Sequence, residues 1–379
     1  MSFPRRLFRP AAGILLVAAP ALRAQQLPTP TPSGTFYIGT YARKIMVMDE
    51  ATMRITDSIP VSIGIPIGMQ LSYDRKHFYV MEPRFESVEI FDIATRKSLG
   101  TFTLSSGNRT VRLSGMNVDP TERFLVMVVK IFTKQPDRFE ISTPKLLKYD
   151  LATRTVTDTI PWPRGEERDF ATIMFSPNGE NMYFFTGEDV LIYDTKTLKQ
   201  VERWEIARAF SEEGFGRLPT FFGTQLYEEP GFFTGLFRVT DPVNRRTLMG
   251  IARSNLMQRT IDWYMLGPPG PSAPGGITLA PGRKRAYGLV QQVGNWQYWT
   301  FDLENKSVLG KIEFKGRPRM QITAGTDGKV IYLHGAGSTL EIRDVNTFAP
   351  IRTIELPGDM TGFVLLPPGP GPTRPGDKK

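Results

Sequence analysis

The feature that most constrains the fold of this chain is a unit that recurs along almost its whole length. In each copy an alternating apolar strand ends in Asp, a short turn follows, and a second strand begins. The anchor residues are Asp49, Asp92, Asp150, Asp194, Asp302 and Asp344. An Asp that opens a tight turn accepts a backbone N–H two residues further on, and a following Thr assists it. We therefore expect these aspartates to form turns rather than to catalyse.

The spacing of the anchors predicts seven units. Successive anchors lie 43, 58, 44, 108 and 42 residues apart, and 108 is two units of 54. The missing unit falls at residues 250–255 and 260–264, which repeat the strand, turn and strand with Ser-Asn in place of Asp.

A second landmark precedes the anchors. It is an apolar strand, a turn rich in Pro, Gly or Asp, and a strand beginning near Tyr, as in residues 71–80, 175–184 and 325–333. Turns such as Ser-Pro-Asn-Gly and Thr-Asp-Gly contain residues that tolerate a positive φ. Each unit is then four antiparallel strands in 40 to 60 residues, which is typical of a β-propeller blade. The sequence predicts an all-β, seven-bladed β-propeller.

The two ends of the repeat region predict that the ring closes. Residues 35–39 read as a second strand without its first, and residues 361–366 read as a first strand without its followers. Joining them completes one blade and hides the sheet edges that an open array would expose. We expect the propeller to span residues 35–366.

Three segments carry a resemblance to a known family: Tyr37-Ile38-Gly39-Thr40, Tyr79-Val80-Met81-Glu82 and Tyr332-Leu333-His334-Gly335. With the strands that follow them, they resemble the YVTN-type seven-bladed propellers, and are similar to the propeller subunits of quinoprotein amine dehydrogenases. The resemblance is specific for the fold and says little about activity, because propellers host many functions. It implies that any quinone cofactor belongs to another subunit, so we expect no cofactor in this chain.

The first 24 residues read as a secretory signal peptide. Arg5, Arg6 and Arg9 precede an apolar stretch at residues 11–22, which is too short to span a bilayer. Ala24 or Ala21 would be the last residue removed, and the Arg pair also resembles the twin-arginine export motif. We expect a periplasmic or secreted protein with no stable membrane insertion after signal removal.

Composition and charge exclude several function classes. The chain has no Cys and two His, so Cys-ligated metal, haem c and thiol chemistry are excluded and we expect no metal site. Loss of the signal removes four arginines and no acid, and lowers the net charge from +9 to +5. This charge is scattered, so nucleic acid is not an expected partner. Residues 25–34 are a Pro-rich linker, and residues 367–379 are a flexible tail that we expect not to pack.

Arginines recur in the segments that join successive blades. Bidentate guanidinium groups at one mouth of the central channel would bind a small acidic ligand or a protein partner. The predicted ligand-binding residues are Arg112, Arg168, Asp169, Arg217 and Arg319. The alternative is that these arginines pair with neighbouring carboxylates in a solvated rim. Two insertions, residues 131–145 and 207–217, form either a lid or docking site, or tolerated surface growth.

The catalytic residues are left open by the sequence. It contains no G-x-S-x-G, H-E-x-x-H, P-loop or G-x-G-x-x-G motif, which disfavours a familiar triad and nucleotide chemistry. A binding or scaffold module is the first interpretation. The alternatives are a lactonase- or lyase-like enzyme using His334, Glu82 and Glu188 as candidates, or a non-catalytic subunit of a periplasmic redox complex.

Overall fold

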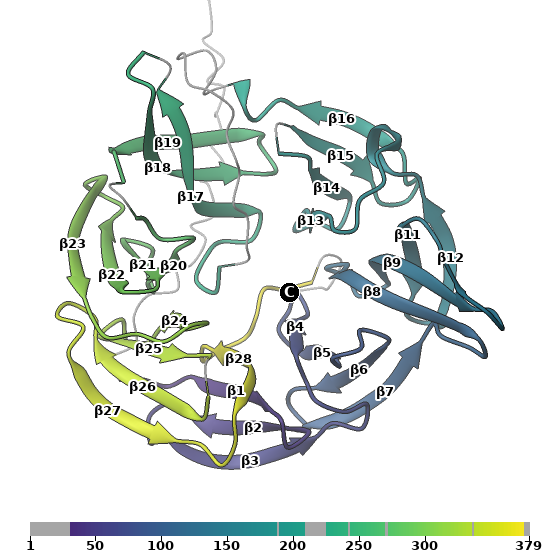
Figure 1. Cartoon of the computed structure of the whole chain (residues 1–379), viewed down its shortest axis with the longest axis horizontal. Helices are drawn as coiled ribbons and strands as arrows, with labels where there is room; N and C mark the ends of the chain where they lie inside the picture. The colour runs from purple at the N-terminus through teal and green to yellow at the C-terminus, as the bar shows by residue number, and fades with distance from the viewer. Residues whose placement is uncertain are drawn as a thin grey trace, which may run out of the picture.

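A computed structural model describes residues 31–187, 189–208, 225–241, 243–269, 272–335 and 337–374. Its strands form seven antiparallel sheets arranged around a ring (Figure 1). The predicted seven-bladed β-propeller is confirmed. No helix among these residues is long and apolar enough to cross a membrane. The signal peptide and most of the linker lie outside them, as do Glu188 and Arg217.

Blade one closes the ring, and it is built from both ends of the chain. Its strands are β28 (Met360–Leu366), β1 (Thr35–Thr40), β2 (Lys44–Asp49) and β3 (Arg54–Pro60), in that order. β28 pairs antiparallel with β1, with Tyr37 opposite Val364. The expected closure by a C-terminal strand is therefore confirmed.

The other blades follow in chain order. Blade two consists of β4 (Gly68–Leu71), β5 (His77–Met81), β6 (Ser87–Asp92) and β7 (Lys97–Thr103). Blade three consists of β8 (Arg109–Val118), β9 (Phe124–Lys134), β11 (Lys145–Asp150) and β12 (Thr155–Ile160), and β10 (Phe139–Ile141) pairs with the far end of β9. Blade four consists of β13 (Thr172–Phe175), β14 (Asn181–Phe185), β15 (Val190–Asp194) and β16 (Gln200–Trp204), preceded by the short helix η1 (Pro163–Gly165).

The remaining three blades complete the ring. Blade five consists of β17 (Phe232–Asp241), β18 (Arg246–Asn255) and β19 (Thr260–Gly267). Blade six consists of β20 (Thr278–Leu279), β21 (Arg285–Gln292), β22 (Asn295–Asp302) and β23 (Ser307–Glu313). Blade seven consists of β24 (Gln321–Ala324), β25 (Val330–His334), β26 (Thr339–Asp344) and β27 (Pro350–Glu355). Three strands of blade five lie in the described part of the chain, which does not include residues 209–224.

Burial explains the composition of the strands. Strands near the channel are covered on both sheet faces, so β5 has three consecutive buried residues and β1 has five. Outermost strands face water on their outer side, and β3 and β12 are exposed along most of their length. Blades pack face to face through aromatic and branched side chains, which is why inner strands are continuously apolar rather than alternating.

The anchor aspartates form turns, as expected, and Asp194, for example, accepts the N–H two residues on. Asp92 differs in detail. Asp92 Oδ1 accepts the backbone N–H of Thr95 at 2.6 Å and the Thr95 hydroxyl at 2.6 Å, so its main partner is three residues on rather than two. These hydrogen bonds lower the pKa of Asp92. The next residue, Arg96, has a φ of 60°. A type I turn followed by one left-handed residue, here Arg96, is a common way to join two antiparallel strands with a β-bulge.

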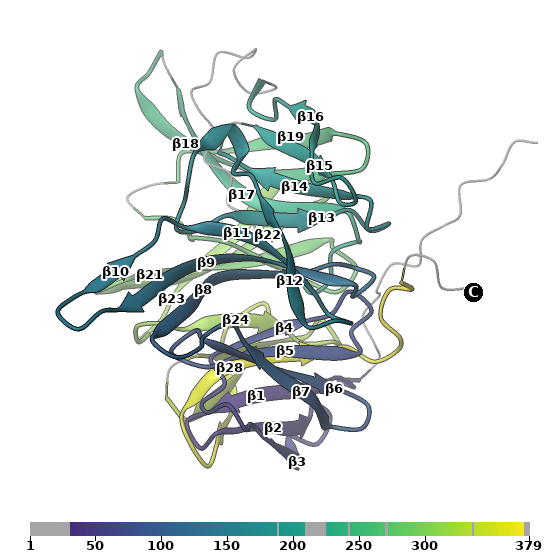
Figure 2. The ribbon, with the colours of Figure 1, turned by 90° about the vertical axis from the view of Figure 1, so that its right-hand side faces the viewer.

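The ring has two unlike faces. The blade-joining face carries the loops between blades and the loops between the second and third strands of each blade. The turn face carries the turns between first and second strands and between third and fourth strands. Figure 2 shows that the β9–β10 extension and the β17–β18 hairpin project from the blade-joining face, on the side opposite the C-terminal tail. The insertion at 131–145 thus lengthens a hairpin, whereas most of the insertion at 207–217 lies outside the described residues.

The tail differs from expectation. Residues 367–379 were expected not to pack, because Pro and Gly dominate them, but Arg374 ion-pairs with Asp74 and Glu122 on the turn face. The long basic side chain of Arg374 reaches two buried carboxylates even though the segment around it is rich in Pro and Gly.

Glu50 stabilises the seam between the first and last blades. Its side chain is fully buried in blade one, at the position that follows an anchor Asp. Its carboxylate accepts hydrogen bonds from the N–H groups of Gly34 at 2.6 Å and Thr326 at 2.9 Å, and from the Tyr332 hydroxyl at 2.9 Å. Thr326 and Tyr332 belong to blade seven, so one carboxylate joins both blades.

We predict that Glu50→Gln lowers the free energy of unfolding by about 2 to 4 kcal/mol, because the amide nitrogen would face buried donors. Urea unfolding of the full chain measures this difference. The control is Glu304→Gln, in the equivalent turn of blade six, where the side chain is 58% exposed and the change should cost under about 0.5 kcal/mol. Equal stability of the two variants would contradict the role of Glu50.

Candidate functional site

Chemistry-bearing side chains gather at two places on the described surface. One is a pocket at blade four on the blade-joining face, beside several of the predicted arginines. The other is a cluster of two carboxylates and a histidine on the turn face, between blades two and three.

Two of the predicted ligand-binding residues lie close together. Arg112 on β8 is exposed, stands opposite Lys130 of β9, and holds its guanidinium 5.1 Å from the centre of the Phe132 ring. Lys130 Nζ forms an ion pair with Asp169 Oδ1 at 3.0 Å. Arg112 and Asp169 therefore lie near each other, because Lys130 stands opposite Arg112 and forms an ion pair with Asp169.

The other predicted residues do not all join them. Arg168 pairs with Glu166 at 2.6 Å on the loop that leads into blade four. Arg319 is exposed on the loop before β24 of blade seven, on the other side of the ring. The predicted set is thus divided between two parts of the blade-joining face.

The blade-four pocket has a volume of about 270 Å³. It lies between the loop after β12 and the turn after β14. Its lining includes Trp162, Glu166, Arg168, Phe170 and Phe185. The Trp162 indole N–H donates to the carbonyl of Pro144 at 2.8 Å and is thereby held in place. The pocket combines aromatic walls with charged groups at its rim.

A buried carboxylate follows the turn that lines this pocket. Asp189 is 4% exposed, and its Oδ2 accepts from Arg203 Nε at 2.9 Å and from Arg164. Arg164 belongs to η1, so this contact ties the loop into blade four to the strand after the pocket.

Two of the three catalytic candidates, His334 and Glu82, lie in the described part of the chain, and both side chains are buried. His334 is 3% exposed, stacks on Phe363 with ring centres 3.7 Å apart, and has Nε2 2.9 Å from the Thr323 hydroxyl. Glu82 is 2% exposed and accepts the N–H groups of Arg84 and Glu86 at 2.7 and 2.8 Å. Catalytic roles for these residues stay predictions, and Glu188 lies outside the described part of the chain.

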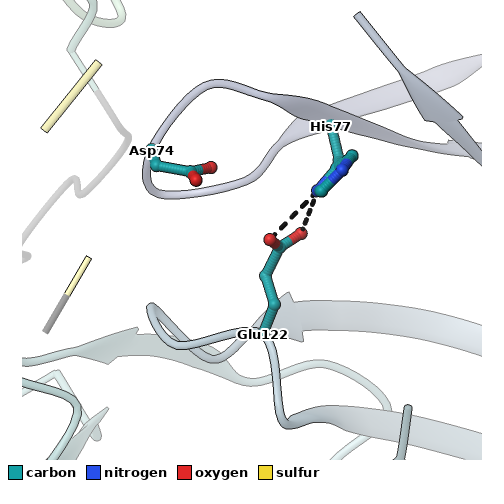
Figure 3. A group of neighbouring side chains, drawn as sticks. All are labelled: Asp74, His77 and Glu122. Atoms are coloured by element: carbon teal, nitrogen blue, oxygen red, sulfur yellow. Dashed lines mark hydrogen bonds and ion pairs between the residues drawn. The ribbon is translucent and has the colours of Figure 1, made fainter. Parts of the chain in front are cut away.

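The turn-face cluster joins two blades (Figure 3). Asp74 lies in the turn after β4, His77 begins β5, and Glu122 lies in the matching turn of blade three. His77 Nδ1 is 2.8 and 3.0 Å from the two Glu122 oxygens. One ligand atom from each of the three residues lies within 4.8 Å of the others.

The surroundings of the cluster hold its groups in place. Asp74 accepts from the Ser72 hydroxyl at 2.8 Å, and Glu122 accepts from the Tyr79 hydroxyl at 2.8 Å. The hydrogen bond that His77 donates to Glu122 raises the pKa of His77, and burial raises the pKa of Tyr79. A pocket of about 230 Å³, lined in part by these groups and by Arg374, opens beside them.

Sequence reasoning missed this cluster because it treated each histidine alone. The available signal was that Asp74 and His77 lie three residues apart around a turn, while Glu122 occupies the corresponding turn of the next unit. Adjacent blades place corresponding turns side by side, so equivalent positions in successive units should be compared.

We predict that His334 makes the fold acid-sensitive. Burial lowers its pKa from 6.5 to about 3, so its share of stability is complete above about pH 6.5 and is lost as the pH falls toward 3. Between pH 7 and 4.5 the wild type should lose about 2 to 3 kcal/mol more than His334→Gln, as measured by urea unfolding at each pH. Parallel losses in both proteins would exclude this effect.

Comparisons with known proteins support the fold alone. No family model matches the chain, and no curated protein matches it. Similar solved structures include a functionally unknown protein from Desulfotomaculum acetoxidans DSM 771 (TM-score 0.53, 13% identity, 89% of this chain and 100% of that chain). Another is the β-propeller domain of Cps50 (Swd1) from Myceliophteria thermophila (TM-score 0.52, 10% identity, 83% and 95%). The chain is similar to propellers, and no match identifies the YVTN-type repeat in particular.

Proposed function

We propose that this chain is an exported β-propeller that binds a small acidic ligand through the blade-four pocket. The observation that carries the proposal is the combination of aromatic walls, Trp162 and Phe170, with the guanidinium of Arg168 at the rim of one pocket. Ligand pockets generally pair apolar lining with a few placed polar groups. Phe170 is 64% exposed, which leaves its ring available to a ligand.

Arg168 can exchange its partner at small cost. Its side chain is 40% exposed and that of Glu166 is 54% exposed, so their ion pair is a solvent-screened surface contact. A ligand carboxylate would take the place of Glu166, while the ligand's apolar part contacts Trp162 and Phe170. Guanidinium then supplies two parallel donors.

The alternatives have unequal support. A scaffold role is favoured by Phe139 and Ile141 on β10, which are 63% and 58% exposed near the end of a projecting hairpin. Within the described residues, the enzyme alternative relies on His334 and Glu82, whose side chains are 3% and 2% exposed and so offer a substrate little access. A redox-complex role has no support beyond the family resemblance.

We predict that the full chain binds indole-3-acetate more tightly than its neutral amide, because only the acid bonds to the guanidinium of Arg168. Isothermal titration calorimetry measures both. Arg168→Ala should weaken binding of the acid about tenfold, or ~1.4 kcal/mol, and leave binding of the amide unchanged.

Arg138→Ala is the matched control, since Arg138 makes a comparable exposed pair with Glu140 on the hairpin. It should bind both probes like the wild type. Equal affinity for acid and amide, or no binding of benzoate, phenylacetate or indole-3-acetate, would count against the proposal.

Export is part of the proposal, and we predict that the protein accumulates in the exported fraction of its own cells. Mass spectrometry of the purified chain should show a mature N-terminus after Ala24 or Ala21, because the apolar stretch has signal-peptide length. A chain that retains residue 1 and stays in the cytosol would contradict it.

A further inference from the structure

We propose that the turn face carries a site for a divalent ion of the zinc class, with Asp74, His77 and Glu122 as its protein ligands. We further propose that Arg374 of the C-terminal tail occupies this site when the metal is absent. The site lies on the opposite face from the blade-four pocket, and it does not depend on the function proposed there.

The donor set suits Zn²⁺. One imidazole nitrogen and two carboxylate oxygens give three protein ligands, and Zn²⁺ accepts such N and O donors with an open fourth position. The three ligand atoms already lie within 4.8 Å of one another. Bonds of about 2.0 to 2.2 Å would require them to close by roughly an ångström.

The ligands are held in place by neighbours rather than by one another alone. The side chains of Asp74 and Glu122 are 3% and 7% exposed. Hydrogen bonds from Ser72 and Tyr79 orient these two carboxylates. Supporting partners of this kind are typical around metal ligands, where they fix ligand orientation.

The ring of His77 provides a separate indication. Its Nδ1 faces Glu122, while its Nε2 lies 3.8 Å from Asp92 Oδ2. Metal-bound histidines commonly have a carboxylate near the second ring nitrogen, which sets the tautomer and ring orientation. Here Nδ1 would bind the ion and Nε2 would face Asp92.

The charge balance favours a divalent ion over one guanidinium. Asp74, Glu122 and Asp92 surround His77, and Arg374 is the cation that contacts the first two. The Nζ of Lys76 is 3.6 Å from Asp74, but its side chain is 67% exposed and therefore strongly screened. One guanidinium balances the charge of one of the two ligand carboxylates, Asp74 and Glu122, whereas a divalent ion would balance both.

Arg374 is well suited to be displaced. It lies in residues 367–374, which form no strand, so its release breaks no ladder of backbone hydrogen bonds. The adjoining pocket of about 230 Å³ gives a metal ion and its water a path to the ligands. Because both cations use the same carboxylates, metal binding and tail docking must weaken each other by the same factor.

The experiment is calorimetric titration of the metal-free full chain with ZnCl₂. We expect one ion per chain. His77→Gln should weaken binding at least tenfold, and Arg374→Ala should strengthen it severalfold, because a competing cation is removed. His334→Gln is the matched control, since it changes the only other histidine and should bind like the wild type.

Release of the C-terminal tail on addition of Zn²⁺ is a second readout, which a cluster that only forms ion pairs would not show. A nitroxide on Thr373→Cys is a unique label because the chain has no Cys. Zn²⁺ should sharpen its spectrum in the wild type and leave it unchanged in the His77→Gln background.

Urea unfolding without metal checks that each variant is folded. Absence of one-to-one binding below about 100 μM Zn²⁺, or equal affinity of the wild type and His77→Gln, would overturn the site. Unchanged affinity in Arg374→Ala would overturn the competition.

Discussion

The pairing of β28 with β1 is the contact on which the rest of the molecule depends. Each blade buries its inner strands only because a neighbour covers each face, so an open array would expose two apolar blade faces and two strand edges. Closure of this ring is non-covalent, since the chain has no Cys. The hydrogen bonds between β28 and β1 and the buried carboxylate of Glu50 must therefore hold the ring closed, a role that a disulfide has in other proteins.

The repeat explains why the fold was predictable. The turn chemistry of Asp92 and its equivalents is local, requires only a few neighbouring residues, and recurs often enough to count blades from the sequence. The unpaired strand at each terminus then predicts closure, because an orphan second strand and an orphan first strand are complementary. The expected N–H two residues on is bonded at Asp194, Asp302 and Asp344, and the N–H three residues on is an additional partner.

The candidate sites were less predictable because they depend on which side chains face one another across blades. The arginines predicted to converge are divided between blades three and four on one side and blade seven on the other. Blade order gives the place of each loop around the ring, but the loop sequence does not specify which carboxylate or ring each side chain contacts. His334, a catalytic candidate from the sequence, shows the same limit, because its side chain is 3% exposed. Its ring turns sideways against Phe363 of the neighbouring blade.

Residues that differ from their equivalents in the other blades are those with a role beyond forming the blade. The position after the anchor is Glu50 in blade one, where other units place Ile93, Leu151, Thr195, Leu256, Leu303 and Val345. Likewise Glu122 has a φ of 52° at a turn position that Arg75, Gly179, Arg283 and Gly328 fill in other blades. A long acidic side chain tolerates this left-handed backbone less readily than Gly. Among these turn residues Glu122 is the acidic one, and its carboxylate contacts His77 and Tyr79, so its identity is better explained by those contacts than by the turn itself.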